Sequence, residues 1–165
     1  MKVAVYPGTF DPVHYGHIDI AKRASELFDQ VVVGIYDRPN KNLLFSLDKR
    51  LDLMREALRD TPNIEVEGYD GLTVDFAKKN GAQVIVRGLR VVWDFELEYQ
   101  MALTNRRLSS DIDTVCLMTT LEYAFISSSS VKEIAQAGGA VDQFVPPHVA
   151  QTLRDCFEAL RQKSI

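Results

Sequence analysis

Apolar residues along the chain recur with two spacings, one typical of strands and one typical of helices. Short runs rich in β-branched residues predict strands at residues 2–6, 30–36, 64–68, 83–86 and 114–118. Longer stretches with apolar residues three and four apart predict helices at residues 18–28, 47–58, 74–80 and 93–108, from 130 to the glycines at 138 and 139, and after 147. Because strands and helices alternate, the pattern predicts an α/β fold.

The run at residues 30–36, QVVVGIY, is apolar almost throughout, which is typical of a strand covered on both faces. With strand 2–6 and helix 18–28 it makes a βαβ unit, and the strands of such a unit lie parallel. Residues 64–68 alternate apolar with acidic side chains, which favours a place near the sheet edge. We therefore predict a five-stranded parallel sheet covered by helices on both faces, with Cys116 buried in its last core strand.

The predicted helix at residues 93–108 carries apolar side chains on more than one face, which indicates burial from two sides. One side faces the sheet. A neighbouring subunit and the C-terminal helix are both possible covers for the other side, and the sequence does not choose between them.

Composition narrows the class of protein. A chain of 165 residues, 46% hydrophobic, predicts one domain over residues 1–165 with an ordinary core. The formal net charge of −4 argues against general nucleic-acid binding, since proteins that neutralise many phosphates are usually basic. Cys116 and Cys156 are far apart and are expected to be free thiols. No apolar run approaches the length of a membrane span or a signal sequence, so we expect a cytoplasmic protein without a membrane partner.

The candidate chemistry centres on residues 6–17, YPGTFDPVHYGH, between the first strand and the first helix. A strand that enters a helix through such a turn leaves the first N–H groups of the helix free to bind an anion. Gly16 lets a phosphate approach the main chain, and His14 and His17 can donate N–H groups to it with a charge adjustable near neutral pH. The alternative is a loop whose histidines are solvated or bind local carbonyls.

Further cationic and polar groups follow other strands. Arg87 and Arg90 flank a glycine turn at the carboxyl end of strand 83–86, where ligands of open α/β sheets bind, although each is also a candidate to pair with Asp94 or Glu96. Lys41 lies in the polar loop at residues 37–42 and is either a phosphate contact or a solvated side chain.

Four serines at residues 127–130 exceed what one helix cap needs and predict a second phosphate cradle rather than a solvated loop. The pattern S-V-K-E at residues 130–133 predicts a capping box that starts the following helix. Thr73 is expected to cap the helix at 74–80 or to contact a ligand.

Three stretches together resemble one family: GTFDPVHYGH at residues 8–17, IVRGLR at 85–90 and YAFISSSSVKE at 123–133. They are similar to the bacterial phosphopantetheine adenylyltransferases, of the nucleotidyltransferase superfamily with the H/T-x-G-H motif, over essentially the whole chain. The resemblance implies a Rossmann-like domain, a homohexamer, and adenylyl transfer from ATP to 4′-phosphopantetheine that yields dephospho-coenzyme A and pyrophosphate in coenzyme A biosynthesis.

The resemblance also implies roles for individual residues. Within the motif, our own choice for the residue that stabilises the transition state is His17. The residues that the resemblance assigns to ATP are Thr9, Phe10, His14, His17, Gly88, Leu89, Arg90, Glu98, Tyr123, Ala124, Phe125, Ile126, Ser127, Ser128 and Ser129. The residues that it assigns to the acceptor substrate are Thr9, Lys41, Thr73 and Arg87.

We expect direct in-line attack of the acceptor phosphate on the α-phosphorus of ATP, because the chain shows no arrangement for a covalent intermediate. Mg²⁺ is expected to arrive with the triphosphate, held by phosphates and water, since no acidic cluster indicates a metal site of the protein's own. Two alternatives stay open: a nucleotidyltransferase that uses nicotinate mononucleotide or glycerol phosphate as acceptor, and a nucleotide-sensing module without turnover.

Overall fold

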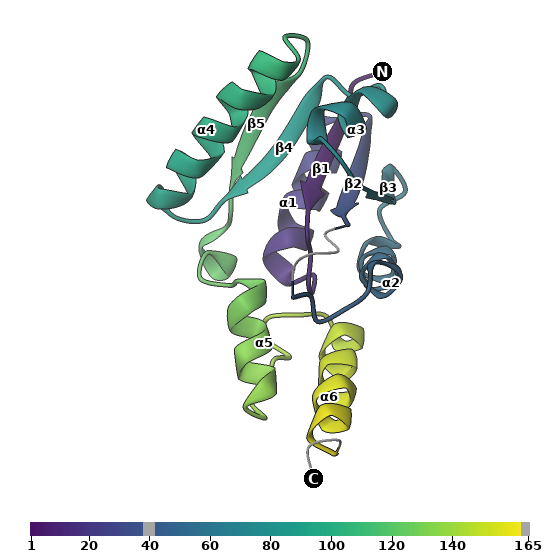
Figure 1. The fold of residues 1–165 in the computed structure, drawn as a ribbon, viewed down its shortest axis with the longest axis vertical. Helices are drawn as coiled ribbons and strands as arrows, with labels where there is room; N and C mark the ends of the chain where they lie inside the picture. The colour runs from purple at the N-terminus through teal and green to yellow at the C-terminus, as the bar shows by residue number, and fades with distance from the viewer. Residues whose placement is uncertain (38–41, 163–165) are drawn as a thin grey trace.

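The computed structural model describes residues 1–37 and 42–162. Its strands form one parallel sheet in the order β3-β2-β1-β4-β5. Their bounds are β1 Val3–Gly8, β2 Gln30–Tyr36, β3 Ile64–Tyr69, β4 Val84–Leu89 and β5 Asp113–Met118. The helices are α1 Tyr15–Leu27, α2 Leu47–Leu58, α3 Thr73–Lys79, α4 Val92–Leu108, α5 Ser128–Gln136 and α6 Pro147–Gln162, with a 3₁₀ turn η1 at Leu121–Tyr123. The predicted five-stranded parallel α/β fold is confirmed (Figure 1).

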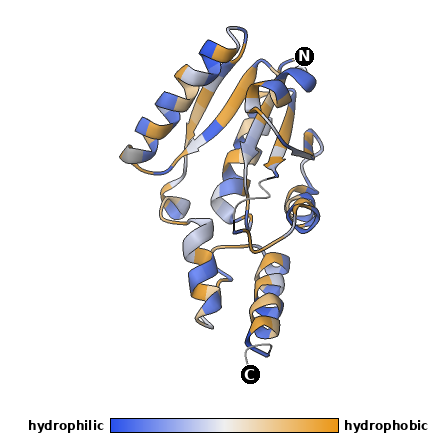
Figure 2. Ribbon diagram, viewed as in Figure 1, coloured by the Kyte–Doolittle hydropathy of each residue, from blue (hydrophilic) through white to orange (hydrophobic). Residues whose placement is uncertain are grey.

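Helices cover both faces of the sheet because successive strand residues point to opposite sides. On one face, Ala4 and Tyr6 of β1 share a core with α1, α2, α5 and α6. On the other face, Val3 and Val5 pack with α3. Residues 31–35 of the inner strand β2 are all buried, so this strand is covered on both faces, which accounts for its continuous apolar run. Figure 2 shows much of the sheet in the orange of hydrophobic residues, apart from a blue segment in β4.

The order of the strands places a crevice at the carboxyl end of β1. The chain proceeds outward from β1 through β2 to β3, and then returns to build β4 and β5 on the other side of β1. The loops after β1 and β4 therefore diverge, and ligands of open α/β sheets bind at such a switch point.

The structure excludes one of the two possible covers for α4, the C-terminal helix. Figure 1 shows α4 beside β5, while α6 lies with α5 at the opposite end of the molecule, so the C-terminal helix does not cover it. Several apolar side chains of α4 are exposed, among them Phe95 at 55% and Leu97 at 69%. The apolar pattern of α4 is thus only partly used within one chain.

The burial of Cys116 is also predicted wrongly. The strand β5 ends the sheet, and its residues are mostly exposed, including Cys116 and Met118. An edge strand lacks the neighbour on one side that covers an inner strand. No helix in the described part of the chain is long and apolar enough to cross a bilayer.

The inner strand β2 permits a test of this packing. A Cβ added at Gly34 would lie 2.9 Å from Cζ of the buried Phe76 ring and 3.1 Å from Tyr69 Cδ1. Because both rings are packed, we expect Gly34→Ala to lower the free energy of unfolding by about 1–3 kcal/mol, measured by urea denaturation. The control is Gly68→Ala, whose Cβ meets Cδ2 of Leu47 at 3.1 Å, the movable end of a side chain. Equal losses in both variants would contradict this account.

Candidate active site

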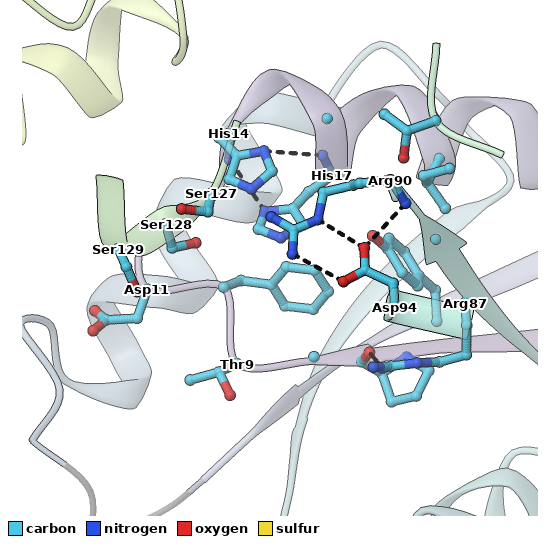
Figure 3. A pocket seen from close by; sticks show the side chains of 18 of the residues that line it. Thr9, Asp11, His14, His17, Arg87, Arg90, Asp94, Ser127, Ser128 and Ser129 are labelled. Carbon is cyan, nitrogen blue, oxygen red and sulfur yellow. Dashed lines mark hydrogen bonds and ion pairs between the residues drawn. The ribbon is translucent and has the colours of Figure 1, made fainter. Parts of the chain in front are cut away.

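A cavity of about 360 Å³ opens where β1 and β4 end (Figure 3). Its walls come from segments far apart in sequence: the turn after β1, the start of α1, the end of β4, α4, and the start of α5. Figure 3 shows the two imidazoles, the Arg90–Asp94 ion pair and the serines facing this one space. The predicted convergence of the motif residues is therefore present in the fold.

The turn after β1 is shaped by Phe10, which has a φ of 49°. Its ring lies over Gly8, where an added Cβ would approach Cζ of Phe10 to 2.6 Å, and its edge meets the His17 ring at a centroid distance of 4.8 Å. A side chain at Gly8 would displace the aromatic ring that supports His17. The glycine is thus needed for close packing within the turn.

The two histidines cap the helix α1 for each other. The backbone N–H of His17 donates to Nδ1 of His14, and the backbone N–H of His14 donates to Nδ1 of His17, each at 3.3 Å. The rings stack with centroids 3.5 Å apart. Since both Nδ1 atoms accept hydrogen bonds, each neutral ring carries its proton on Nε2.

The histidines are therefore uncharged donors. Burial, with a smaller effect of Arg90, lowers the pKa of His14 to about 3. Burial, followed by His14 and the two arginines, holds the pKa of His17 well below 6.5. The expectation of a charge adjustable near neutral pH is wrong, because both imidazoles are desolvated beside permanent cations.

Gly16 lies against the ring of His14, where a side chain would not fit. A Cβ at Gly16 would lie 3.0 Å from Cε1 and 3.1 Å from Nδ1 of His14. The absence of a side chain thus leaves room for the imidazole, where the sequence had suggested room for a ligand.

Each arginine of the R-G-L-R stretch is held by a carboxylate of α4. Arg87 binds Glu98 through Nε at 2.8 Å and Nη2 at 2.7 Å, and donates from Nη1 to Pro7 O at 2.7 Å. Arg90 binds Asp94 through Nε at 3.2 Å and donates from Nη1 to Ile126 O at 3.0 Å. Pairing with Asp94 was foreseen, but Glu98 takes the place proposed for Glu96. Asp94 and Glu98 are one helical turn apart, so one face of α4 supplies both counter-ions.

The serine stretch starts α5 earlier than predicted. Ser127 is the N-cap, and it exchanges hydrogen bonds with Ser130, so the capping box lies three residues before the expected S-V-K-E. Ser128 Oγ donates to Pro12 O at 2.8 Å, which ties α5 to the turn after β1. The positive end of the α5 dipole therefore faces the cavity.

A second cavity, of about 350 Å³, joins the first at Thr9, Arg87 and Glu98. It runs between α3 and α4, past Thr73 and the apolar side chains of Leu72 and Met101. Thr73 does not cap α3, whose N-cap is Leu72 without a side-chain bond; its Oγ1 lies 3.2 Å from the Tyr69 hydroxyl. The two cavities thus adjoin at a shared wall, and the second is the more apolar of the two.

Most predicted site residues line these two cavities. The first is lined by Thr9, Phe10, His14, His17, Arg87, Gly88, Arg90, Glu98, Ser127, Ser128 and Ser129, and the second adds Thr73. Gly88 and Leu89 belong to β4 rather than to a turn, and Leu89 is buried. Lys41 lies outside the described residues.

The stretch before the serines lies apart from both linings. Ile126 is buried and contributes its carbonyl to Arg90, while Tyr123 stacks on Tyr15 at 6.0 Å. Ala124 is half-buried, and Phe125 is 69% exposed. In this structure the stretch supports the site from outside.

Sequence reasoning missed several lining residues. Lys132 and Asp11 form an ion pair at 3.0 Å, and both line the first cavity. Lys132 stands one helical turn after Ser128 and Ser129, and that spacing would have placed it on their face of α5. Asn42, the last residue of the polar loop at residues 37–42, also lines the cavity.

The carboxylates of the site are already engaged with cations. Asp11, Asp94 and Glu98 each pair with a lysine or an arginine. Within residues 1–37 and 42–162, no group of three or more His, Cys, Asp or Glu side chains is placed to hold a metal ion. The described residues that line the cavity therefore offer no cluster of unpaired carboxylates for a metal ion.

The histidine pair predicts a distinct pH response. Because the unfolded chain binds these protons near pH 6.5 and the folded chain does not, the free energy of unfolding should fall as the pH drops below 6.5, by about 1–2 kcal/mol per histidine at pH 5. Nitrogen-15 NMR of the folded protein should show two Nε2–H tautomers that do not titrate between pH 8 and pH 5. A midpoint near 6.5 for either ring would contradict the assignment.

The chain is similar to known proteins over most of its length. The family profile described as cytidylyltransferase-like matches residues 5–134. A phosphopantetheine adenylyltransferase of Caldanaerobacter subterraneus subsp. tengcongensis is 51% identical over 96% of this chain and 99% of its own. One of Carboxydothermus hydrogenoformans is 52% identical over 96% and 98%. The crystal structure of a putative nicotinate-nucleotide adenylyltransferase from Vibrio parahaemolyticus superposes with a TM-score of 0.69 at 18% identity, over 94% of this chain and 93% of that chain, and shows the same fold.

The matched segment contains the histidine turn, both arginines and the serine start of α5, so the similarity includes the residues that build the cavity. The chain belongs to the phosphopantetheine adenylyltransferase family of cytidylyltransferase-like proteins.

Proposed function

We propose that this protein transfers the adenylyl group of ATP to 4′-phosphopantetheine, yielding dephospho-coenzyme A and pyrophosphate in coenzyme A biosynthesis. The observation that carries the proposal is the pair of adjoining cavities that share Thr9, Arg87 and Glu98 in their linings. One is lined by donors suited to phosphates, and the other is a more apolar path of similar size. Two substrates that meet at their phosphates fit such a path, with Thr9 and Arg87 at the junction.

The first cavity is proposed to bind ATP. The Nε2–H groups of His14 and His17, the guanidinium of Arg90 and the start of α5 are all donors to a triphosphate. Ile126 fixes Arg90 through its carbonyl, and the rest of 123–126 is assigned to the nucleotide from family resemblance. Lys132 adds an ammonium group to the same wall.

The second cavity is proposed to hold the pantetheine arm, which is partly apolar. Its phosphate would lie at Thr9 and Arg87, and the arm would pass Thr73. The Arg87–Glu98 pair does not preclude phosphate binding, because Arg87 uses three donors for Glu98 and Pro7 and a guanidinium has five. Lys41 remains a proposed acceptor contact.

The chemistry is proposed to be direct. The acceptor phosphate attacks the α-phosphorus in line, and pyrophosphate leaves, without a covalent enzyme intermediate. In both histidines Nδ1 accepts a backbone N–H, and Nε2 carries the proton. Neither imidazole therefore has a free nitrogen lone pair with which to act as a base for a serine nucleophile. His17 instead donates Nε2–H to an α-phosphate oxygen, where negative charge develops in the transition state. Since the ring is neutral and packed between Phe10 and His14, the donor is held in place before substrate arrives.

Mg²⁺ is proposed to enter with ATP, coordinated by phosphate oxygens and water, since the cavity carboxylates are paired with cations.

We also propose the homohexamer implied by family resemblance, to which the exposed apolar side chains of α4 lend support. A cytoplasmic location is proposed with it, in keeping with two free cysteines.

The choice of acceptor is testable directly. Pyrophosphate release should be fastest with ATP and 4′-phosphopantetheine, by about 10²-fold or more in kcat/KM over nicotinate mononucleotide or glycerol phosphate, and over CTP as donor. A preference for another acceptor would assign the chain to a different nucleotidyltransferase reaction. Tight ATP binding with no product from any acceptor would favour a nucleotide-sensing module.

The role of His17 has its own test. Removing one preorganised donor to the developing charge should lower kcat by about 10²–10³-fold in His17→Ala, while the Kd for ATP changes much less. Isothermal titration and single-turnover kinetics measure the two quantities separately. The control is His148→Ala, since His148 lies away from both cavities and contacts Leu53 O at 3.0 Å. Near-normal turnover in His17→Ala would refute the assigned role.

A further inference from the structure

The helix α2 carries a buried arginine that the proposed chemistry does not use. Arg50 is only 1% exposed and binds backbone carbonyls. Its Nε donates to Phe45 O at 3.2 Å, and its Nη1 donates to Thr9 O at 2.8 Å and Tyr36 O at 3.0 Å. In the part of the chain that the structure describes, its Nη2 has no hydrogen-bond partner.

Burial of a guanidinium group is energetically unfavourable compared with burial of an apolar side chain. Removing a charge from water costs several kcal/mol, and an apolar side chain of similar volume would avoid that cost. Unlike an apolar side chain, Arg50 contacts carbonyls from three separate segments: the turn after β1, the end of β2 and the segment before α2. Its donors therefore fix the relative positions of these segments.

Asp11 holds the segment before α2 from the other side. This carboxylate is 3% exposed and accepts the N–H of Leu44 at 2.8 Å and of Phe45 at 3.0 Å, as well as Lys132 Nζ at 3.0 Å. Phe45 is thus bound through its N–H by Asp11 and through its carbonyl by Arg50.

The segments joined in this way border the place where the two cavities adjoin. Thr9 lies at the junction of the two cavities, and Tyr36 lines the second. Asn42 and Leu43, directly before the clamped residues, line the first. The histidines, Arg90 and the serines come from α1, the end of β4 and α5, and Arg50 makes none of its hydrogen bonds to them.

We propose that Arg50, together with Asp11, is a positioning residue that sets where the acceptor phosphate lies relative to the α-phosphorus. It acts through the Thr9 carbonyl and the Leu44–Phe45 segment and does not touch substrate. This inference rests on the proposed function, because the assignment of Thr9 to the acceptor phosphate is part of that proposal.

The test compares Arg50→Met, Arg50→Lys and Met54→Ala in the full chain. Met54 lies one turn further along α2, is 1% exposed and lies away from both cavities, so its truncation reports the effect of lost packing alone. In Arg50→Met, kcat/KM for 4′-phosphopantetheine should fall about tenfold or more, since misplacement by an ångström is costly in rate. The Kd for ATP should be little changed, and Arg50→Lys should recover part of the loss because an ammonium still donates to carbonyls. Met54→Ala should lose stability but keep both constants.

A readout independent of turnover separates the two proposals. Hydrogen exchange at the amides of Leu44 and Phe45, which donate to Asp11, should accelerate in Arg50→Met and not in Met54→Ala. Unchanged exchange, or a loss of kcat/KM that matches the unfolded fraction, would overturn the positioning role. A wild-type protein that fails to turn over 4′-phosphopantetheine would overturn the proposed function instead, and the exchange rates would still decide whether Arg50 fixes the segment.

Discussion

The site depends on the exchange of hydrogen bonds between His14 and His17 at the start of α1. Each imidazole accepts the backbone N–H of the other residue, so both Nδ1 atoms receive a hydrogen bond and the start of the helix is capped. The same exchange fixes the tautomer, and burial beside Arg90 keeps the rings neutral. Helix capping and the placement of the proposed catalytic donor are thus one arrangement, and movement of either ring would break one of the two capping hydrogen bonds.

The described cationic side chains that line the first cavity are each held by a carboxylate, and the two arginines also bind a backbone carbonyl. Arg87 and Arg90 pair with Glu98 and Asp94, and Lys132 pairs with Asp11. Paired charges keep their geometry while the cavity is empty, and each guanidinium retains donors for a ligand. A chain with a net charge of −4 can in this way present phosphate donors locally without being basic overall.

The sequence predicted the sheet well because its signals were strong and local. The continuous apolar run of β2 requires cover on both faces, and the alternation at residues 64–68 correctly placed β3 at an edge. Helix starts were predicted less well. The helix α1 begins at Tyr15 and not at the predicted Ile18, because its N-cap is His14 and histidine is not a typical N-cap residue. Among four adjacent serines, the pattern alone did not identify Ser127 as the N-cap of α5. Cys116 was misplaced because an apolar strand does not reveal whether a neighbour exists on its far side.

Within the site, the motifs correctly indicated which segments meet. They did not indicate which side chains pair with one another there. Glu98 as the partner of Arg87 and Arg50 as a buried donor to Thr9 depend on how α2 and α4 pack against the sheet, which no local pattern encodes.

The helix α4 faces two ways. Its inner side carries the carboxylates that orient both arginines, and its outer side carries exposed apolar side chains such as Phe95 and Leu97. A helix moves as a stiff rod, so any surface that shelters the outer residues also constrains the counter-ions. A cover that bound α4 differently in the empty and the occupied site would be thermodynamically linked to the affinities of the proposed substrates, and by reciprocity those substrates would alter how tightly that cover is held.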